Sequence, residues 1–132
     1  MVFLDSSAII EYQIGNERVQ EYLTGREPWW TSPLCVYEVV AGRLGGSGTD
    51  VQAVRNEFGG VRVVDLNETI ALEAARLQDE LLADGNRLAT ADALIAATAR
   101  STGDELVVAD DDFQTSVLAD LMAVRNFEPA SE

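Results

Sequence analysis

Four acidic residues of this sequence lie beside apolar segments, where carboxylates are uncommon. Asp5 directly follows the apolar segment VFL, and Glu38 interrupts the apolar run LCVYEVVA. Asp92 lies within LATADALIAATA, and Asp110 directly follows LVVA. A carboxylate that is removed from water costs free energy unless a cation or hydrogen-bond donors compensate it. Because carboxylate oxygens suit hard divalent cations, these four acids predict a Mg²⁺ or Mn²⁺ site.

The composition excludes most other catalytic groups. All nine basic residues are arginine, and the chain contains no histidine. It therefore lacks an imidazole base, a Schiff-base lysine and the lysine of a phosphate-binding loop. Cys35 is the only cysteine, which excludes an intramolecular disulfide and a cysteine-based zinc site and indicates a small buried thiol. Hydrolysis assisted by a metal ion is the chemistry that remains.

Each acid also has a purely structural interpretation. Asp5 can cap the helix that follows it, and Glu38 can lie on a solvated helix face. The positive end of a helix dipole can stabilise Asp92, and the triplet at positions 110–112 can be a solvated acidic turn. These alternatives stay open for each residue by itself. The combination favours a metal site, because two acids end apolar strands and two interrupt apolar helices.

The elements that position these acids are predicted from hydrophobic periodicity and from capping and turn residues. Alternating strands and helices predict an α/β fold with a mostly parallel sheet and helices on both faces. In such sheets ligands bind beyond the carboxyl ends of the strands, where Asp5 and Asp110 are expected. The length fits a single domain over residues 1–132. Strands are expected at 1–4, 29–31, 61–66, 105–109 and 122–127, and helices at 6–13, 17–23, 33–44, 50–58, 68–82, 90–101 and 115–119.

The charge of the chain argues against a polyanionic substrate. A formal net charge of −14 repels nucleic acids at ordinary ionic strength. The objection weakens in a very salty cytosol, because the Debye length is only about 3 Å near 1 M salt. Together with the absence of lysine, the acidic excess leads us to the hypothesis of a halophilic source. No apolar run approaches the length of a membrane span, so we expect a cytoplasmic protein without membrane contact.

Four segments together resemble the PIN-domain nucleases, and among them the VapC-type toxins of toxin–antitoxin pairs. They are VFLDSSAII, PLCVYEVVAGRL, LATADALIAATA and LVVADDDF, in this order over nearly the whole chain. The resemblance implies a three-layer α/β/α domain that binds one or two Mg²⁺ or Mn²⁺ ions and cleaves RNA. It implies that Asp5, Glu38, Asp92 and Asp110 are the catalytic, metal-binding acids.

The resemblance extends to further residues. Asp112 matches a more variable acid that assists the metal site, and Ser6 or Ser7 matches a hydroxyl position that supports it. Val108 replaces the threonine that is common in the family, so one hydroxyl contact is missing. The acidic triplet leaves open whether Asp110, Asp111 or Asp112 is the fourth ligand. Arg43 is a candidate for phosphate binding, with an exposed arginine at a helix end as the alternative.

The implied activity is that of an endoribonuclease. Water activated by the metal would attack phosphorus and leave 5′-phosphate and 3′-hydroxyl ends. The absence of histidine excludes a metal-free route with imidazole catalysis. The resemblance also implies a homodimer and a cognate antitoxin. The apolar residues that can form such a surface, with core packing as the alternative, are Ile9, Ile10, Tyr12, Trp29 and Trp30.

Other interpretations are weaker or remain open. Response-regulator receivers and haloacid-dehalogenase-type phosphatases also carry aspartates at strand ends, but both need a lysine that this chain lacks. A catalytically silent PIN-like module that binds only RNA or an antitoxin stays open as the alternative. Trp29 and Trp30 can stack on bases or be buried structurally.

Overall fold

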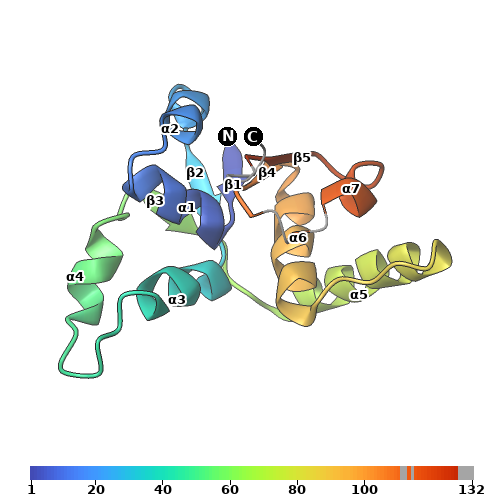
Figure 1. Ribbon diagram of the computed structural model, residues 1–132. Coiled ribbons are helices and arrows are strands. Elements are labelled where there is room, and N and C mark those ends of the chain that lie inside the picture. Colours follow the sequence, from blue (N-terminus) through green and yellow to red (C-terminus); the bar gives the residue numbers. More distant parts are fainter. Residues whose placement is uncertain (111–112, 114, 128–132) are drawn as a thin grey trace.

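The structure is a computed structural model that describes residues 1–110, 113 and 115–127. Helices and strands alternate along most of the chain, as the sequence predicts (Figure 1). The strands are β1 (Val2–Leu4), β2 (Trp29–Thr31), β3 (Val61–Val63), β4 (Glu105–Val108) and β5 (Val124–Asn126). The helices are α1 (Ser6–Gln13), α2 (Glu17–Leu23), α3 (Pro33–Ala41), α4 (Val51–Asn56), α5 (Glu68–Ala83), α6 (Thr90–Thr102) and α7 (Thr115–Leu118).

The described strands form one five-stranded sheet in the order β3-β2-β1-β4-β5. Every pairing in this sheet is parallel, which confirms the predicted α/β class. The chain builds the sheet outward from β1 to β2 and β3, and then returns to the opposite side of β1 with β4 and β5. The strand order therefore reverses between β1 and β4, and ligands bind at this point in parallel sheets.

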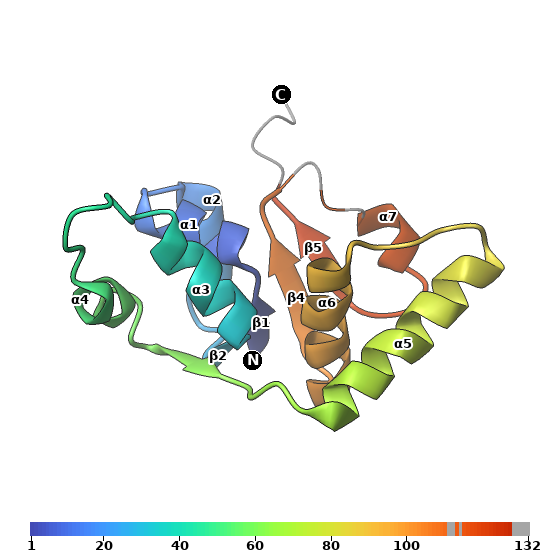
Figure 2. The ribbon, with the colours of Figure 1, turned by 90° about the horizontal axis from the view of Figure 1, so that it is seen from below.

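Helices cover both faces of the sheet, in three layers (Figure 2). Alternate residues of a strand point to opposite faces, so Phe3 enters one core and its neighbours Val2 and Leu4 enter the other. The core that contains Phe3 also receives α5, α6 and α7, and the other core receives α1, α2 and α4. Helix α3 contributes to both, because Cys35 joins the first core and Val39 joins the second.

Several element ends differ from the sequence prediction. Helix α3 ends at Ala41 rather than at residue 44, because Arg43 and Leu44 bond to the carbonyls three residues back and tighten the chain into a turn. Strand β3 ends at Val63 rather than at residue 66, because its partner β2 ends at Thr31. Asn16 caps α2 and Asn67 caps α5, since both side chains accept backbone N–H bonds. No described helix combines the length and the apolar character that crossing a bilayer requires.

Candidate active site

Asp5 joins the end of β1 to the start of α1. Its carboxylate is buried, and Oδ2 accepts hydrogen bonds from the backbone N–H of Ser7 at 3.1 Å and from the Ser7 hydroxyl at 2.5 Å. Asp5 is therefore the N-cap of α1, which confirms the structural interpretation of this residue. The physical reason is that Asp5 still has an extended backbone, while the chain is helical from Ser6 onward.

Glu38 reaches the same place from the middle of α3. Its side chain is exposed, and Oε1 accepts a hydrogen bond of 2.7 Å from the Ser6 hydroxyl. Cys35 lies one helical turn earlier, with its sulfur 3.9 Å from Oδ1 of Asp5. One ligand atom from each of Asp5, Cys35 and Glu38 lies within 4.8 Å of the other two. Helix α3 thus brings Glu38 beside the acid that ends β1.

Cys35 is buried, as its sequence context predicts, but its contact with Asp5 was not foreseen. Burial raises the pKa of the Cys35 thiol to about 12, and the nearby charge of Asp5 adds to the effect. The thiol is therefore protonated at neutral pH and acts as a weak donor toward Asp5. A protonated thiol is a poor ligand for a hard cation, so the carboxylates of Asp5 and Glu38 are the donors here.

Asp92 lies in the first turn of α6 and is half-buried. Burial raises the pKa of its carboxyl, and the like charges of Asp5, Glu38 and Asp110 raise it further. Burial also raises the pKa of Asp5; the hydrogen bonds from Ser7 oppose this, and Asp110 again adds to it. The charges of the four acids therefore act on one another although the residues lie far apart in the chain, whereas the group of ligand atoms within 4.8 Å of one another comprises Asp5, Glu38 and Cys35 and not Asp92 or Asp110.

Asp110 follows β4, and two side chains hold the backbone at this point. The N–H of Ala109 donates to the Ser7 hydroxyl at 2.9 Å, and the N–H of Asp110 donates to Oδ1 of Asn126 at 3.2 Å. The predictions for Asp111 and Asp112 lie outside the described residues. Sequence reasoning missed Asn126 altogether, because a single asparagine on an edge strand carries no motif.

The two predicted substrate-binding residues lie in different surroundings. Ser6 touches Glu38 and so lies within the acidic site. Arg43 follows the end of α3, is exposed, and donates to Glu57 at 2.6 and 3.3 Å. Its hydrogen bonds with Glu57 raise the pKa of its guanidinium. Phosphate binding by Arg43 stays a prediction, and a phosphate would have to compete with Glu57.

A hard divalent cation fits the donor set of this site. None of the ion pairs among the described residues involves Asp5, Glu38 or Asp92, so no arginine neutralises these carboxylates. Mg²⁺ and Mn²⁺ prefer oxygen donors, and a bound cation would relieve the repulsion between these carboxylates. The residues that would hold the ion are Asp5, Glu38 and Asp92, with Asp110 beside them.

A separate pocket of about 450 Å³ is lined by residues of β1, α1, α2 and β2 and by the segment from Glu57 to Val61. Its aromatic lining comes from Tyr12, Trp29 and Phe58, and none of the four acids borders it. Trp29 meets Tyr12 edge-on and donates its indole N–H to the carbonyl of Leu23 at 3.2 Å. Of the residues considered for a partner surface, Ile9 is buried in the core, whereas Ile10 is exposed.

Comparison with known proteins identifies the family. The PIN domain family model matches residues 2–116. The chain belongs to the PIN domain family. No curated protein sequence matches significantly. Among solved structures, a toxin–antitoxin complex from Klebsiella pneumoniae is 21% identical with a TM-score of 0.76, and the match covers 97% of this chain and 98% of the other.

Two further solved structures extend this comparison. FitAcB from Neisseria gonorrhoeae is 27% identical with a TM-score of 0.74, over 96% of this chain and 97% of the other. VapC20 from Mycobacterium tuberculosis, described as a toxin that cleaves the sarcin–ricin loop, is 19% identical with a TM-score of 0.60, over 88% of this chain and 95% of the other. The matched lengths agree with a PIN domain that extends over most of the chain.

Proposed function

We propose that this PIN-domain protein is a Mg²⁺-dependent endoribonuclease and the toxin of a type II toxin–antitoxin system. The proposal is carried by carboxylates from separate elements whose charges act on one another, at positions 5, 38, 92 and 110, with Asp5 and Glu38 in close proximity. The family match and the neighbouring structures from toxin–antitoxin pairs support it. VapC20, which cleaves an RNA loop, supports RNA as the substrate class.

The residues of this chain would bind and orient the ion and the water. A bound Mg²⁺ or Mn²⁺ supplies Lewis-acid activation and neutralises charge on the phosphate. Asp5 is preorganised, because the two bonds from Ser7 fix Oδ2, while Oδ1 lies 3.9 Å from the sulfur of Cys35. Ser6 holds the long Glu38 side chain in place. The products of hydrolysis would be 5′-phosphate and 3′-hydroxyl ends.

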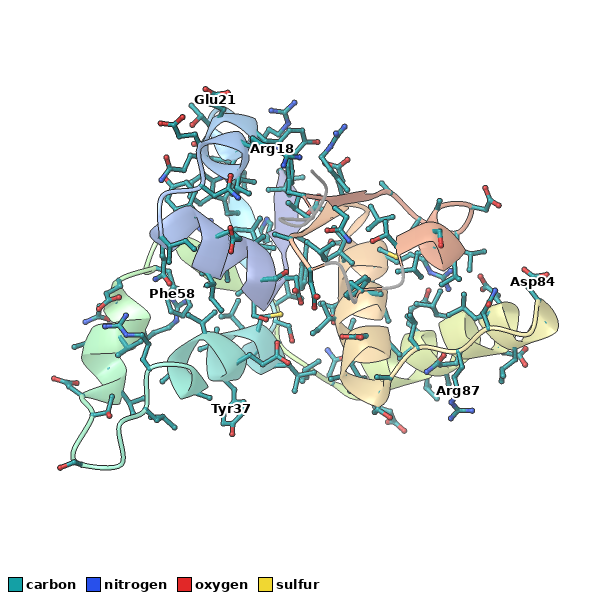
Figure 3. The ribbon with its side chains drawn as sticks, viewed as in Figure 1. Arg18, Glu21, Tyr37, Phe58, Asp84 and Arg87 are labelled. Atoms are coloured by element: carbon teal, nitrogen blue, oxygen red, sulfur yellow. The ribbon has the colours of Figure 1, made fainter. Side chains whose placement is uncertain are left out.

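The proposed partners are an RNA substrate, a cognate antitoxin and a second copy of the chain, all in the cytoplasm. The aromatic pocket at Tyr12 and Trp29 and the exposed side chain of Ile10 on α1 support the binding of an apolar segment of the antitoxin. Tyr37 and Leu72 are large exposed apolar side chains on α3 and α5 and are candidates for the homodimer surface; Tyr37 points outward from α3 (Figure 3). Light scattering of the purified chain, alone and with its antitoxin, tests both associations.

The decisive experiment is cleavage of a mixed RNA pool with Mg²⁺ at the ionic strength of the host. We expect Asp5→Ala and Asp92→Ala to lose at least ~10³-fold in rate, and EDTA to abolish cleavage. Asp79→Ala, which removes an exposed acid of α5, is the matched control and should cleave like the wild type.

Two outcomes would overturn the enzymatic proposal. Equal cleavage by all variants would point to a contaminating nuclease or to another site. No cleavage by the wild type, together with retained binding of RNA or antitoxin, would favour the catalytically silent binding module.

A further inference from the structure

The carboxamide of Asn126 pairs with the backbone of Asp110 in both directions. Oδ1 of Asn126 accepts the N–H of Asp110 at 3.2 Å, and Nδ2 of Asn126 donates to the carbonyl oxygen of Asp110 at 2.9 Å. The two contacts fix which end of the amide is oxygen and which is nitrogen. Among the natural side chains of this length, only asparagine offers a donor and an acceptor in this geometry.

The amide of Asn126 is itself anchored. Its Nδ2 also donates to the hydroxyl of Thr115 at 2.8 Å, at the start of α7. The carbonyl of Asp110 receives a second bond, from the N–H of Phe113 at 3.1 Å. The backbone at Asp110 is therefore held from β5 and from the chain that leads into α7.

Where β4 ends, side-chain contacts replace the backbone hydrogen bonds that join neighbouring strands of the sheet. The N–H of Phe127 still donates to the carbonyl of Val108 at 2.8 Å, but the next amides, of Ala109 and Asp110, find side-chain acceptors. The hydroxyl of Ser7, which follows β1, accepts the hydrogen bond from the N–H of Ala109. The carboxamide of Asn126, on β5, accepts the one from the N–H of Asp110. The two side chains thus define where the chain leaves the sheet and which residue first enters the acidic site.

We propose that Asn126 is a positioning residue for metal binding, which acts by fixing the backbone of Asp110 so that this carboxylate joins Asp5, Glu38 and Asp92. The inference rests on the proposed function and adds that the fold holds the backbone of Asp110 in place for this role. Asn126 contributes no ligand atom. Its effect must therefore pass through Asp110.

The test is a double-mutant cycle read out by Mn²⁺ affinity, measured by calorimetric titration of the intact chain. Asn126→Ala is expected to weaken Mn²⁺ binding by about 10-fold or more, as loss of a residue that orients a ligand does elsewhere. In an Asp110→Asn background, which is titrated at millimolar Mn²⁺, Asn126→Ala should change the affinity less than about twofold. Asn56→Ala removes an exposed asparagine of α4 and should leave the affinity unchanged.

The possible results separate the inference from the proposed function. A wild type that binds no Mn²⁺ overturns both. A wild type that binds, with Asn126→Ala equal to it, overturns the inference alone. A loss that persists in the Asp110→Asn background shows general destabilisation and also overturns it. If Asn126→Ala does not fold, Thr115→Val enters the same cycle, with an expected loss of about threefold that disappears in the Asp110→Asn background.

Discussion

Carboxylates serve opposite purposes in two regions of this molecule. Between α5 and α6, Glu73 and Glu80 both bind the guanidinium of Arg100, at 2.8 and 2.9 Å. The hydrogen bond from Arg100 lowers the pKa of Glu80. At the acidic site, burial and like charges raise the pKa values of Asp5 at the end of β1 and of Asp92 in α6, and none of the ion pairs among the described residues involves either carboxylate.

The difference separates stability from function. Arg100 pairs with two carboxylates where α5 and α6 must be held together, whereas none of the ion pairs among the described residues involves Asp5, Glu38 or Asp92. The α5–α6 pairs favour the folded chain, whereas the repulsion at the site opposes folding until a cation binds. Sites that carry out chemistry commonly sacrifice stability in this way. Four substitutions test the contrast, in decreasing order of expected effect.

The largest effect is expected from Glu38→Gln. This change keeps the size of the side chain and an acceptor for Ser6, but it removes one negative charge from the site. The rate of RNA cleavage should fall by about 10³-fold, or roughly 4 kcal/mol, while Tm is unchanged or higher. Glu21→Gln, on the outer side of α2, is the control (Figure 3). A loss of less than tenfold would contradict a role for Glu38 in catalysis.

The next effect is a loss of stability in Arg100→Met. This variant leaves Glu73 and Glu80 without their shared partner, and the side chain of Arg100 is only 19% exposed. The free energy of unfolding in urea should fall by about 2 kcal/mol, with cleavage per folded molecule retained. Arg87→Met, at an exposed position near the far end of α5, provides the comparison (Figure 3). If the two variants were equally stable, the claim that the pairs of Arg100 with Glu73 and Glu80 stabilise the fold would be wrong.

A smaller effect, a gain in stability rather than a loss, is expected from Asp92→Asn in the metal-free protein. The pKa of Asp92 is raised in the folded state, so the folded chain holds this proton more tightly than the unfolded chain. The free energy of unfolding therefore falls as the pH rises through the pKa that Asp92 has in the folded state. Asparagine does not ionise, so the Asp92→Asn variant does not lose this stability. Denaturation with EDTA present should show a gain of about 1 kcal/mol at neutral pH, and no gain below the usual carboxyl pKa. If the variant were less stable than the wild type at neutral pH, the claim that repulsion between these acids destabilises the metal-free chain would be wrong.

The smallest effect is expected from Arg43→Gln. Its pair with Glu57 is exposed on both sides, and such pairs contribute little, so Tm should not change measurably. If Arg43 contacts phosphate, KM for RNA should rise by about threefold with kcat unchanged, and molar salt should remove the difference. An unchanged KM at low salt would leave Arg43 as a helix-end arginine.

Sequence reasoning located the elements and the acids because both are local signals. Alternating apolar runs fix the strands and their faces, and a single carboxylate within an apolar run is visible without coordinates. Element ends were less certain, since the end of α3 depends on turn bonds and that of β3 on its partner strand. The contacts that organise the site join residues 102, 30 and 16 positions apart: Ser7 with Ala109, Cys35 with Asp5, and Asn126 with Asp110.

Composition leads to a hypothesis that the fold does not address. A halophilic protein with a net charge of −14 should lose stability in dilute buffer, because unscreened repulsion favours the unfolded chain. Melting curves from low to molar NaCl measure this directly. Full stability without added salt would contradict a halophilic source.

The two oxygens of Asp5 have separate duties, and this has an evolutionary consequence. Oδ2 accepts both hydrogen bonds from Ser7 and so caps α1, whereas Oδ1 takes no part in the cap and lies beside the thiol of Cys35. Asparagine at position 5 would still cap α1 but would remove the negative charge from the site, and alanine would remove both the cap and the charge. A descendant that gives up cleavage but keeps its partners is therefore expected to carry asparagine or serine at this position, and its inactivity would leave little trace in the shape of the domain.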